Sequence, residues 1–188
     1  VQLDTQKSFP LKVLPTLLAA IEDPDENFQN LESAKLAANA LAGWKGHYLK
    51  EDIAPTIWER FYYFGLQEVY GDKLPDDLYK SFLKTHLVED SFLKLIRNPH
   101  SPWWKKPRSS IGSQQNVIRI SWRKAIDSLV NQFGTNVSDW KWGRMHTLEF
   151  RHPFYRATKA ARILNVGPFP MDGTKETINH LGFSIKET

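Results

Sequence analysis

Two histidines stand close together near the carboxyl end of the chain, in the run from Trp140 to Phe154. If that run is an extended strand, alternate side chains share a face, and His146 and His152 point to the same side. Six residues of strand would separate the two by about 20 Å, at roughly 3.3 Å per residue. A shared zinc ion needs both nitrogens about 2 Å away. We therefore predict no metal site and expect both imidazoles to bond to the backbone, with His146 as a candidate for lining a pocket.

No side chain of this chain can be assigned as a catalytic nucleophile. Cysteine is absent, which excludes thiol catalysis and thiolate metal sites, and no G-x-S-x-G turn occurs. S-x-x-K pairs such as Ser81 and Lys84 lack the S-D-N and K-T-G boxes that accompany serine–lysine catalysis. An N-terminal nucleophile requires Ser, Thr or Cys at position 1, where Val1 stands. Phosphate-binding glycine motifs are also absent. We predict no catalytic residue here.

The run of residues 103–108, W-W-K-K-P-R, is the best candidate for contact with a polyanion. Cations beside aromatic rings can bind phosphates and stack on bases. A single such cluster in a chain of net charge +4 is also typical of a solvated loop that covers packed indoles. We therefore expect no nucleic-acid partner. The alternative hypothesis is a non-enzymatic α+β module that binds an anionic partner through this loop.

Composition is that of a folded chain. Its 188 residues are 41% hydrophobic and include seven Trp, enough to bury a core. No apolar run approaches the roughly 20 residues that span a bilayer, and no secretory signal stands at the start. We expect neither a membrane span nor global disorder.

The hydrophobic pattern changes period along the chain. Helical spacing of apolar residues predicts helices over about 11–21, 30–42, 55–70, 76–97 and 115–133, the fourth with a break near Asp90. Three prolines predict a loop over 98–112. After Gly134 the pattern alternates over 144–152, and short apolar pieces with Gly and Pro follow over 160–188, which predicts strands and turns. The fold is therefore expected to be α+β, with a helix-rich part at 1–134 and a strand and turn part at 135–188.

The late run resembles the signature W-x-W-G-x-x-H-x-x-x-F-x-H-P, found towards the end of the large chain of penicillin amidase family enzymes. The matching positions are Trp140, Trp142, Gly143, His146, Phe150, His152 and Pro153. Gly167 and Pro168 lie in a segment that looks like the family's apolar-x-G-P-x-P. Asn179 ends a turn that resembles its T-V/I-N, although this chain has fewer glycines there than the family usually shows.

The resemblance implies an N-terminal nucleophile hydrolase whose precursor cuts itself to expose a serine. That serine attacks an amide, its own α-amine acts as the base, and an asparagine with a backbone N–H stabilises the oxyanion. In the family these residues precede the section matched here, and the calcium ligands also lie elsewhere. No catalytic or metal-binding residue is therefore carried over, and the matching positions are expected to build scaffold.

The resemblance also implies that this chain is a fragment of a larger enzyme. Its partners would be the remainder of the large chain and the small chain, with which its strands would complete an αββα sandwich. The intact enzyme would be an acylase, periplasmic or secreted in a bacterium, with calcium as a possible cofactor. Its substrate would be an acylated small molecule such as a penicillin or an acyl homoserine lactone. The fragment alone is expected to be inactive.

Overall fold

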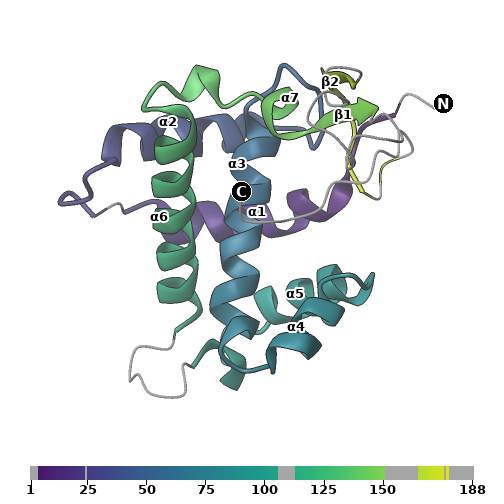
Figure 1. The fold of residues 1–188 in the computed structure, drawn as a ribbon. Coiled ribbons are helices and arrows are strands. Elements are labelled where there is room, and N and C mark those ends of the chain that lie inside the picture. Colours follow the sequence, from purple (N-terminus) through teal and green to yellow (C-terminus); the bar gives the residue numbers. More distant parts are fainter. Residues whose placement is uncertain (1–3, 24, 106–112, 151–164, 176, 178–188) are drawn as a thin grey trace.

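The computed structural model describes residues 4–23, 25–105, 113–150, 165–175 and 177, and they form an α+β fold (Figure 1). The α-helices are α1 (Ser8–Ile21), α2 (Leu31–Gly43), α3 (Ala54–Leu66), α4 (Asp76–Phe82), α5 (Leu87–Ile96), α6 (Gln114–Phe133) and the short α7 (Trp142–Met145). One π-helical turn, η1 (Gln67–Gly71), continues α3, and two 3-10 turns are η2 (Pro102–Trp104) and η3 (Val137–Asp139). The strands are β1 (Thr147–Phe150) and β2 (Val166–Pro170). Helices come first and strands last, as the sequence predicts.

Helix α3 is the centre of the core. It begins with Pro55 in its first turn, where the fixed φ of proline suits a helix start, and all its residues except Tyr63 are buried. A helix that is buried all round must be covered on every side, and α3 packs along α6 and against α2. Helix α1 crosses α6, α5 and α2. Aromatic rings form part of this core, and within α3 the rings of Trp58 and Tyr62 stack with their centres 5.7 Å apart.

Helix α6 is defined by its ends. The Ser113 hydroxyl caps the first turn by accepting from the Asn116 N–H at 3.2 Å. Gly134 ends the helix with φ of +87° and donates its N–H to the Val130 carbonyl at 2.8 Å. Of the apolar stripe predicted for this helix, five residues are buried, Ile118, Trp122, Ala125, Ile126 and Leu129, and two are partly buried, Val130 and Phe133.

Two local predictions were wrong in position. The break in the fourth helix lies between Phe82 and Leu87, not near Asp90, because the Thr85 hydroxyl and N–H both donate to the Phe82 carbonyl and close α4 there. The described part of the predicted loop over 98–112 agrees with that prediction and contains only the short turn η2. The strand expected from residue 144 begins only at Thr147.

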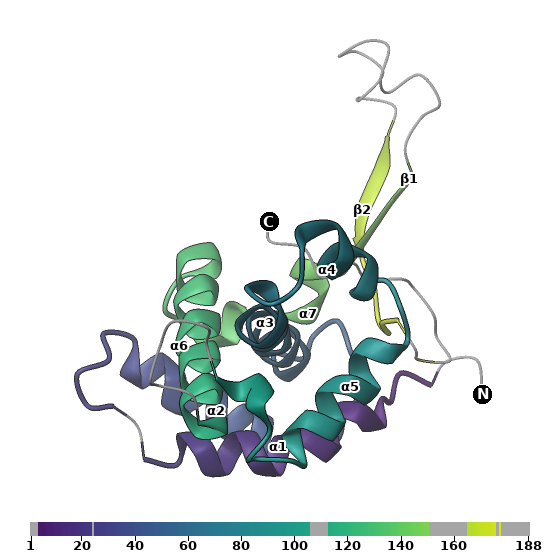
Figure 2. The same cartoon turned by 90° about the horizontal axis from the view of Figure 1, so that it is seen from below.

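The two strands form an antiparallel ribbon that projects beyond the helices (Figure 2). Leu148 pairs with Phe169 and Phe150 pairs with Val166, with a register shift between these pairs. Gly167 lies in the shifted stretch with φ of +112°, and a Cβ there would stand 2.7 Å from the Leu148 carbonyl oxygen. Directly paired residues point to the same face. The ribbon therefore has one apolar face, which we call the ribbon face: Leu148, Phe150, Val166 and Phe169.

None of the helices in the described part of the chain is long and apolar enough to cross a membrane.

Candidate functional site

Helix α7 stands at the meeting point of two loops that are far away in the sequence. The N–H of Trp142 donates to the Asp52 carbonyl and the N–H of Gly143 donates to the Lys50 carbonyl, both at 2.8 Å. The first N–H groups of a helix have no partner inside it, so these bonds satisfy the start of α7. We call this region the signature junction: α7 and His146, the loop of residues 46–52, and residues 170–174.

Trp142 joins all three parts of the junction. Its side chain is fully buried, and its indole N–H donates to the Gly173 carbonyl at 2.9 Å. Its ring contacts the edge of Tyr48 at 5.3 Å, and the Gly173 N–H in turn donates to the Tyr48 carbonyl at 2.7 Å. One indole therefore fixes the distance between the two loops.

Gly143 allows the two loops to approach. A Cβ at this position would lie 2.8 Å from the Cβ of Pro170 and 3.0 Å from the Cβ of Lys50. It would also lie 3.1 Å from the Lys50 carbonyl oxygen, which accepts the hydrogen bond of Gly143 itself. Any side chain would push these segments apart, so the residue type follows from close backbone packing.

His146 is buried beneath the strand that it precedes. Its Nδ1 lies 3.1 Å from the Met171 carbonyl oxygen, and the Met171 N–H donates to the His146 carbonyl at 2.9 Å. The imidazole also packs against the Trp142 ring at 5.1 Å. Among the described pockets none is lined by His146. The ring holds the 170–174 segment to α7.

The remaining signature positions are spread over other places. Trp140 is fully buried, and its indole N–H donates to the Gly134 carbonyl at 2.9 Å. Phe150, Gly167 and Pro168 belong to the exposed ribbon. Three predicted positions lie outside the described residues: His152, Pro153 and Asn179.

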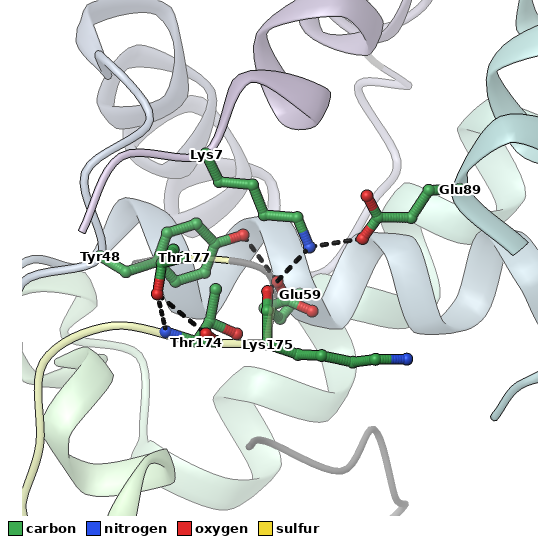
Figure 3. A network of polar contacts seen from close by, with 7 residues as sticks. All are labelled: Lys7, Tyr48, Glu59, Glu89, Thr174, Lys175 and Thr177. Carbon is green, nitrogen blue, oxygen red and sulfur yellow. Dashed lines mark hydrogen bonds and ion pairs between the residues drawn. The ribbon is translucent and has the colours of Figure 1, made fainter. Parts of the chain in front are cut away.

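A buried polar group that the sequence did not reveal lies beside the junction (Figure 3). We call it the Lys7 cluster: Lys7, Tyr48, Glu59 and Glu89. The Lys7 ammonium pairs with Glu89 and lies 3.4 Å from the Lys175 carbonyl oxygen. The Tyr48 hydroxyl donates to Glu59 at 2.6 Å. These residues come from the segment before α1, the loop before α3, α3 itself and α5, so no sequence spacing relates them.

The electrostatics of the Lys7 cluster follow from burial. Burial raises the pKa of Glu59, while the Lys7 ammonium and the Tyr48 hydroxyl act in the opposite direction and Glu89 adds to the rise. Burial and the neighbouring carboxylates raise the pKa of Tyr48 well above its usual value, so its hydroxyl keeps its proton and remains a donor. Through Lys7 and the Lys175 carbonyl, the cluster connects the segment before α1 to residues near the carboxyl end of the described chain.

A turn of two threonines adjoins the cluster (Figure 3). The Thr177 hydroxyl donates to the Thr174 carbonyl at 2.8 Å and accepts from the Thr174 N–H at 3.0 Å. Both residues are buried. This exchange of bonds stabilises a turn and gives no base that would activate the hydroxyl.

Comparison with known proteins identifies the family of this chain. The family model for penicillin amidase matches residues 1–187. The chain belongs to the penicillin amidase family. A curated relative, the acyl-homoserine lactone acylase QuiP of Pseudomonas aeruginosa, is 23% identical over 164 residues. The match covers 78% of this chain and 19% of the relative, so the chain spans about a fifth of the relative's length.

No group of three or more His, Asp or Glu side chains is placed to hold a metal ion in the residues that the structure describes. In the 103–108 loop, Trp104 is buried and its indole N–H donates to the Asn98 carbonyl at 2.9 Å, whereas Trp103 is 41% exposed. Residues 106–108 lie outside the described part, so binding of an anionic partner there stays a prediction.

Stability should depend on pH through Glu59. Because burial raises its pKa in the fold, the folded chain holds this proton more tightly than the unfolded chain. The stability contributed by this group is therefore lost as pH rises from about 4.3, the ordinary glutamate pKa, towards the raised value. Glu59→Gln does not titrate and keeps an acceptor for Tyr48. We expect the difference in unfolding free energy between the variant and the wild type, measured in urea, to change in favour of the variant as pH rises from about 4 to about 7.

Glu51→Gln is the matched control. The hydrogen bond from Lys141, together with its charge, lowers the pKa of the exposed Glu51. Its contribution is present above the ordinary pKa and is lost as pH falls, which is the opposite sign. The same pH trend in both variants would contradict the assignment to Glu59.

Proposed function

We propose that this chain is part of an acylase that hydrolyses the amide bond of an acylated small molecule. The proposal is supported by membership of the penicillin amidase family and by a relative named an acyl-homoserine lactone acylase. A serine at the start of the intact large chain would be the nucleophile, outside these residues. The helical body and the signature junction would then act as scaffold.

The observation that supports a larger enzyme around this chain is the exposed ribbon face. Phe150, Val166 and Phe169 are 59%, 55% and 46% exposed. A two-stranded ribbon is marginal alone, and unpaired strand edges favour pairing with further strands. Both β1 and β2 have no other strand beside them among the described residues. These features favour a larger sheet, built with the rest of the large chain and the small chain, that covers the ribbon.

The intact enzyme is proposed to be periplasmic or secreted. Calcium is proposed as a possible cofactor of the intact enzyme, with its main ligands in the rest of the large chain. Substrates of the proposed class are penicillins and acyl homoserine lactones.

The activity is tested by comparing the isolated 188-residue chain with the intact polypeptide. Each is incubated with an acyl homoserine lactone and with a penicillin, and release of the free amine is measured. We expect hydrolysis of at least one substrate by the intact polypeptide and none above background by the isolated chain. Robust turnover by the isolated chain, or no amide hydrolysis by the intact enzyme, would overturn the proposal.

Substitution in the ribbon tests the role of its face. Phe150→Ser removes a side chain that is largely exposed here but would be buried in a larger sheet. Burial of a phenylalanine is worth about 1.5–3 kcal/mol, so we expect that loss in unfolding free energy for the intact enzyme. The same change should be close to neutral in the isolated chain. Urea denaturation of both forms gives the comparison.

The control is Leu36→Ser on α2, where Leu36 is 49% exposed away from the ribbon. Its cost is expected to be small in both forms. If Phe150→Ser is equally mild in the isolated chain and in the intact enzyme, the ribbon face is not covered.

A further inference from the structure

A second apolar feature lies far from the signature junction. Between α4, α5 and the turns η1 and η2 there is an open cavity of about 510 Å³, which we call the α4 hollow. Figure 1 shows α4 and α5 beside the end of α3 that is remote from α7 and β1. The volume is within the roughly 300–1,000 Å³ of small-molecule sites. The apolar walls are Tyr70, Leu74, Leu78, Phe82, Leu95 and Trp103.

Two hydroxyl groups of the lining are already paired with each other. The Tyr70 hydroxyl and the Ser91 hydroxyl share a hydrogen bond of 2.7 Å. The ring of Tyr70 is held by Phe82 at 5.1 Å and by Trp103 at 5.5 Å. The interior therefore offers apolar surface and does not require a ligand with several polar groups.

The wall formed by α4 is not buried in the core. No residue of α4 is buried, Leu78 is 53% exposed and Trp103 is 41% exposed. When an apolar ligand covers apolar side chains that surround a hollow, their surface is removed from water, and this lowers the free energy.

The lining of the hollow includes a cation. Lys94 is the charged residue of the lining, and its ammonium has no ion-pair partner among the described residues. The Lys73 ammonium lies 5.7 Å from the Trp103 ring centre. No carboxylate is among the described residues that line the hollow. An apolar interior with a cation at its rim is complementary to an amphipathic anion with one polar end.

We propose that the α4 hollow binds a long-chain alkyl carboxylate, with the chain along Tyr70, Leu78 and Trp103 and the carboxylate at Lys94. The site is a binding site and takes no part in amide hydrolysis. It rests on the geometry of α4 and α5 and is independent of the proposed acylase activity.

The first test measures binding to the intact polypeptide. Octanoate, decanoate and dodecanoate are titrated below their micelle concentrations by calorimetry. Each buried methylene should raise the affinity by about fourfold. Bromine-labelled dodecanoate should quench tryptophan fluorescence saturably, and Trp103→Phe should remove most of that quenching while calorimetric binding persists. Absence of saturable binding, which is also the outcome if another part of the enzyme fills the hollow, would overturn the proposal.

The second test uses paired charge reversals. Lys94→Glu should weaken dodecanoate binding by about fivefold, because it replaces the carboxylate's exposed partner, worth up to about 1 kcal/mol, with a like charge. Lys80→Glu makes the same change on the exposed surface of α4, outside the lining, and should leave the affinity unchanged. Leu78→Glu, at an exposed position that the fold does not require, should abolish binding with an unchanged circular dichroism spectrum. Equal losses in Lys94→Glu and Lys80→Glu, or full binding by Leu78→Glu, would contradict the proposed site.

Discussion

Replacement of Trp142 by alanine is expected to lower the unfolding free energy by about 3–5 kcal/mol, the usual range for removal of a buried aromatic side chain. The indole is fully buried and packs against Tyr48 and His146. Its loss leaves a cavity between two loops and also leaves the Gly173 carbonyl without its donor. Urea denaturation followed by far-ultraviolet circular dichroism gives the free energy.

Two further variants make this result specific. Trp142→Phe keeps a ring and removes the indole N–H, so it separates the hydrogen bond, worth about 0.5–1.5 kcal/mol, from the packing. This variant also serves if the alanine variant does not fold. Trp103→Ala removes an indole that is 41% exposed and should cost much less. Similar losses for Trp142→Ala and Trp103→Ala would show that the signature junction does not stabilise the fold.

Lys7→Met is expected to cost about 1.5–3 kcal/mol, because it removes a hydrogen bond between two charged groups and leaves a partly buried carboxylate without its partner. The side chains of Lys7 and Glu89 are only 9% and 21% exposed, and Glu59 lies in the same cluster. Methionine has a similar length and keeps much of the packing. The measurement is the midpoint and slope of urea unfolding at neutral pH.

Lys141→Met is the matched comparison for Lys7→Met. Lys141 pairs with Glu51 at 2.7 Å, but their side chains are 47% and 68% exposed. Exposed pairs contribute about 0–1 kcal/mol and are screened by salt. Adding Glu89→Gln to Lys7→Met should restore part of the loss, since it removes the charge left unpaired. If the two lysine variants lose the same stability, burial gives the Lys7 pair no special importance.

The helical part of the fold was predictable because its signals are local. The apolar stripe of α6 and its end at Gly134 follow from neighbouring residues, and so does the start of α3 near Pro55. The break after α4 was misplaced because a hydroxyl bond from Thr85 decides it, and such a bond has no periodic signal.

The site was less predictable because its contacts are distant in the chain. The helical turn of α7 forms where a strand was expected, since its N–H groups find partners in Lys50 and Asp52 rather than in another strand. The Lys7 cluster draws on four separate segments, so its members could not be associated from spacing. The signature residues themselves could be named from the pattern. That Trp142, Gly143 and His146 all contact the segments of the signature junction could be seen only in the structure.

The contacts across the signature junction also set the order in which the chain can fold on the ribosome. The Lys50 N–H donates to the Asp172 carboxylate, a partner 122 residues further along the chain. At a synthesis rate of about 5–20 residues per second, Asp172 is added roughly 6–24 s after Lys50. During that interval the loop of residues 46–52 has no partner from the 170–174 segment. The helices can pack first, and the junction closes only near the end of translation of this segment.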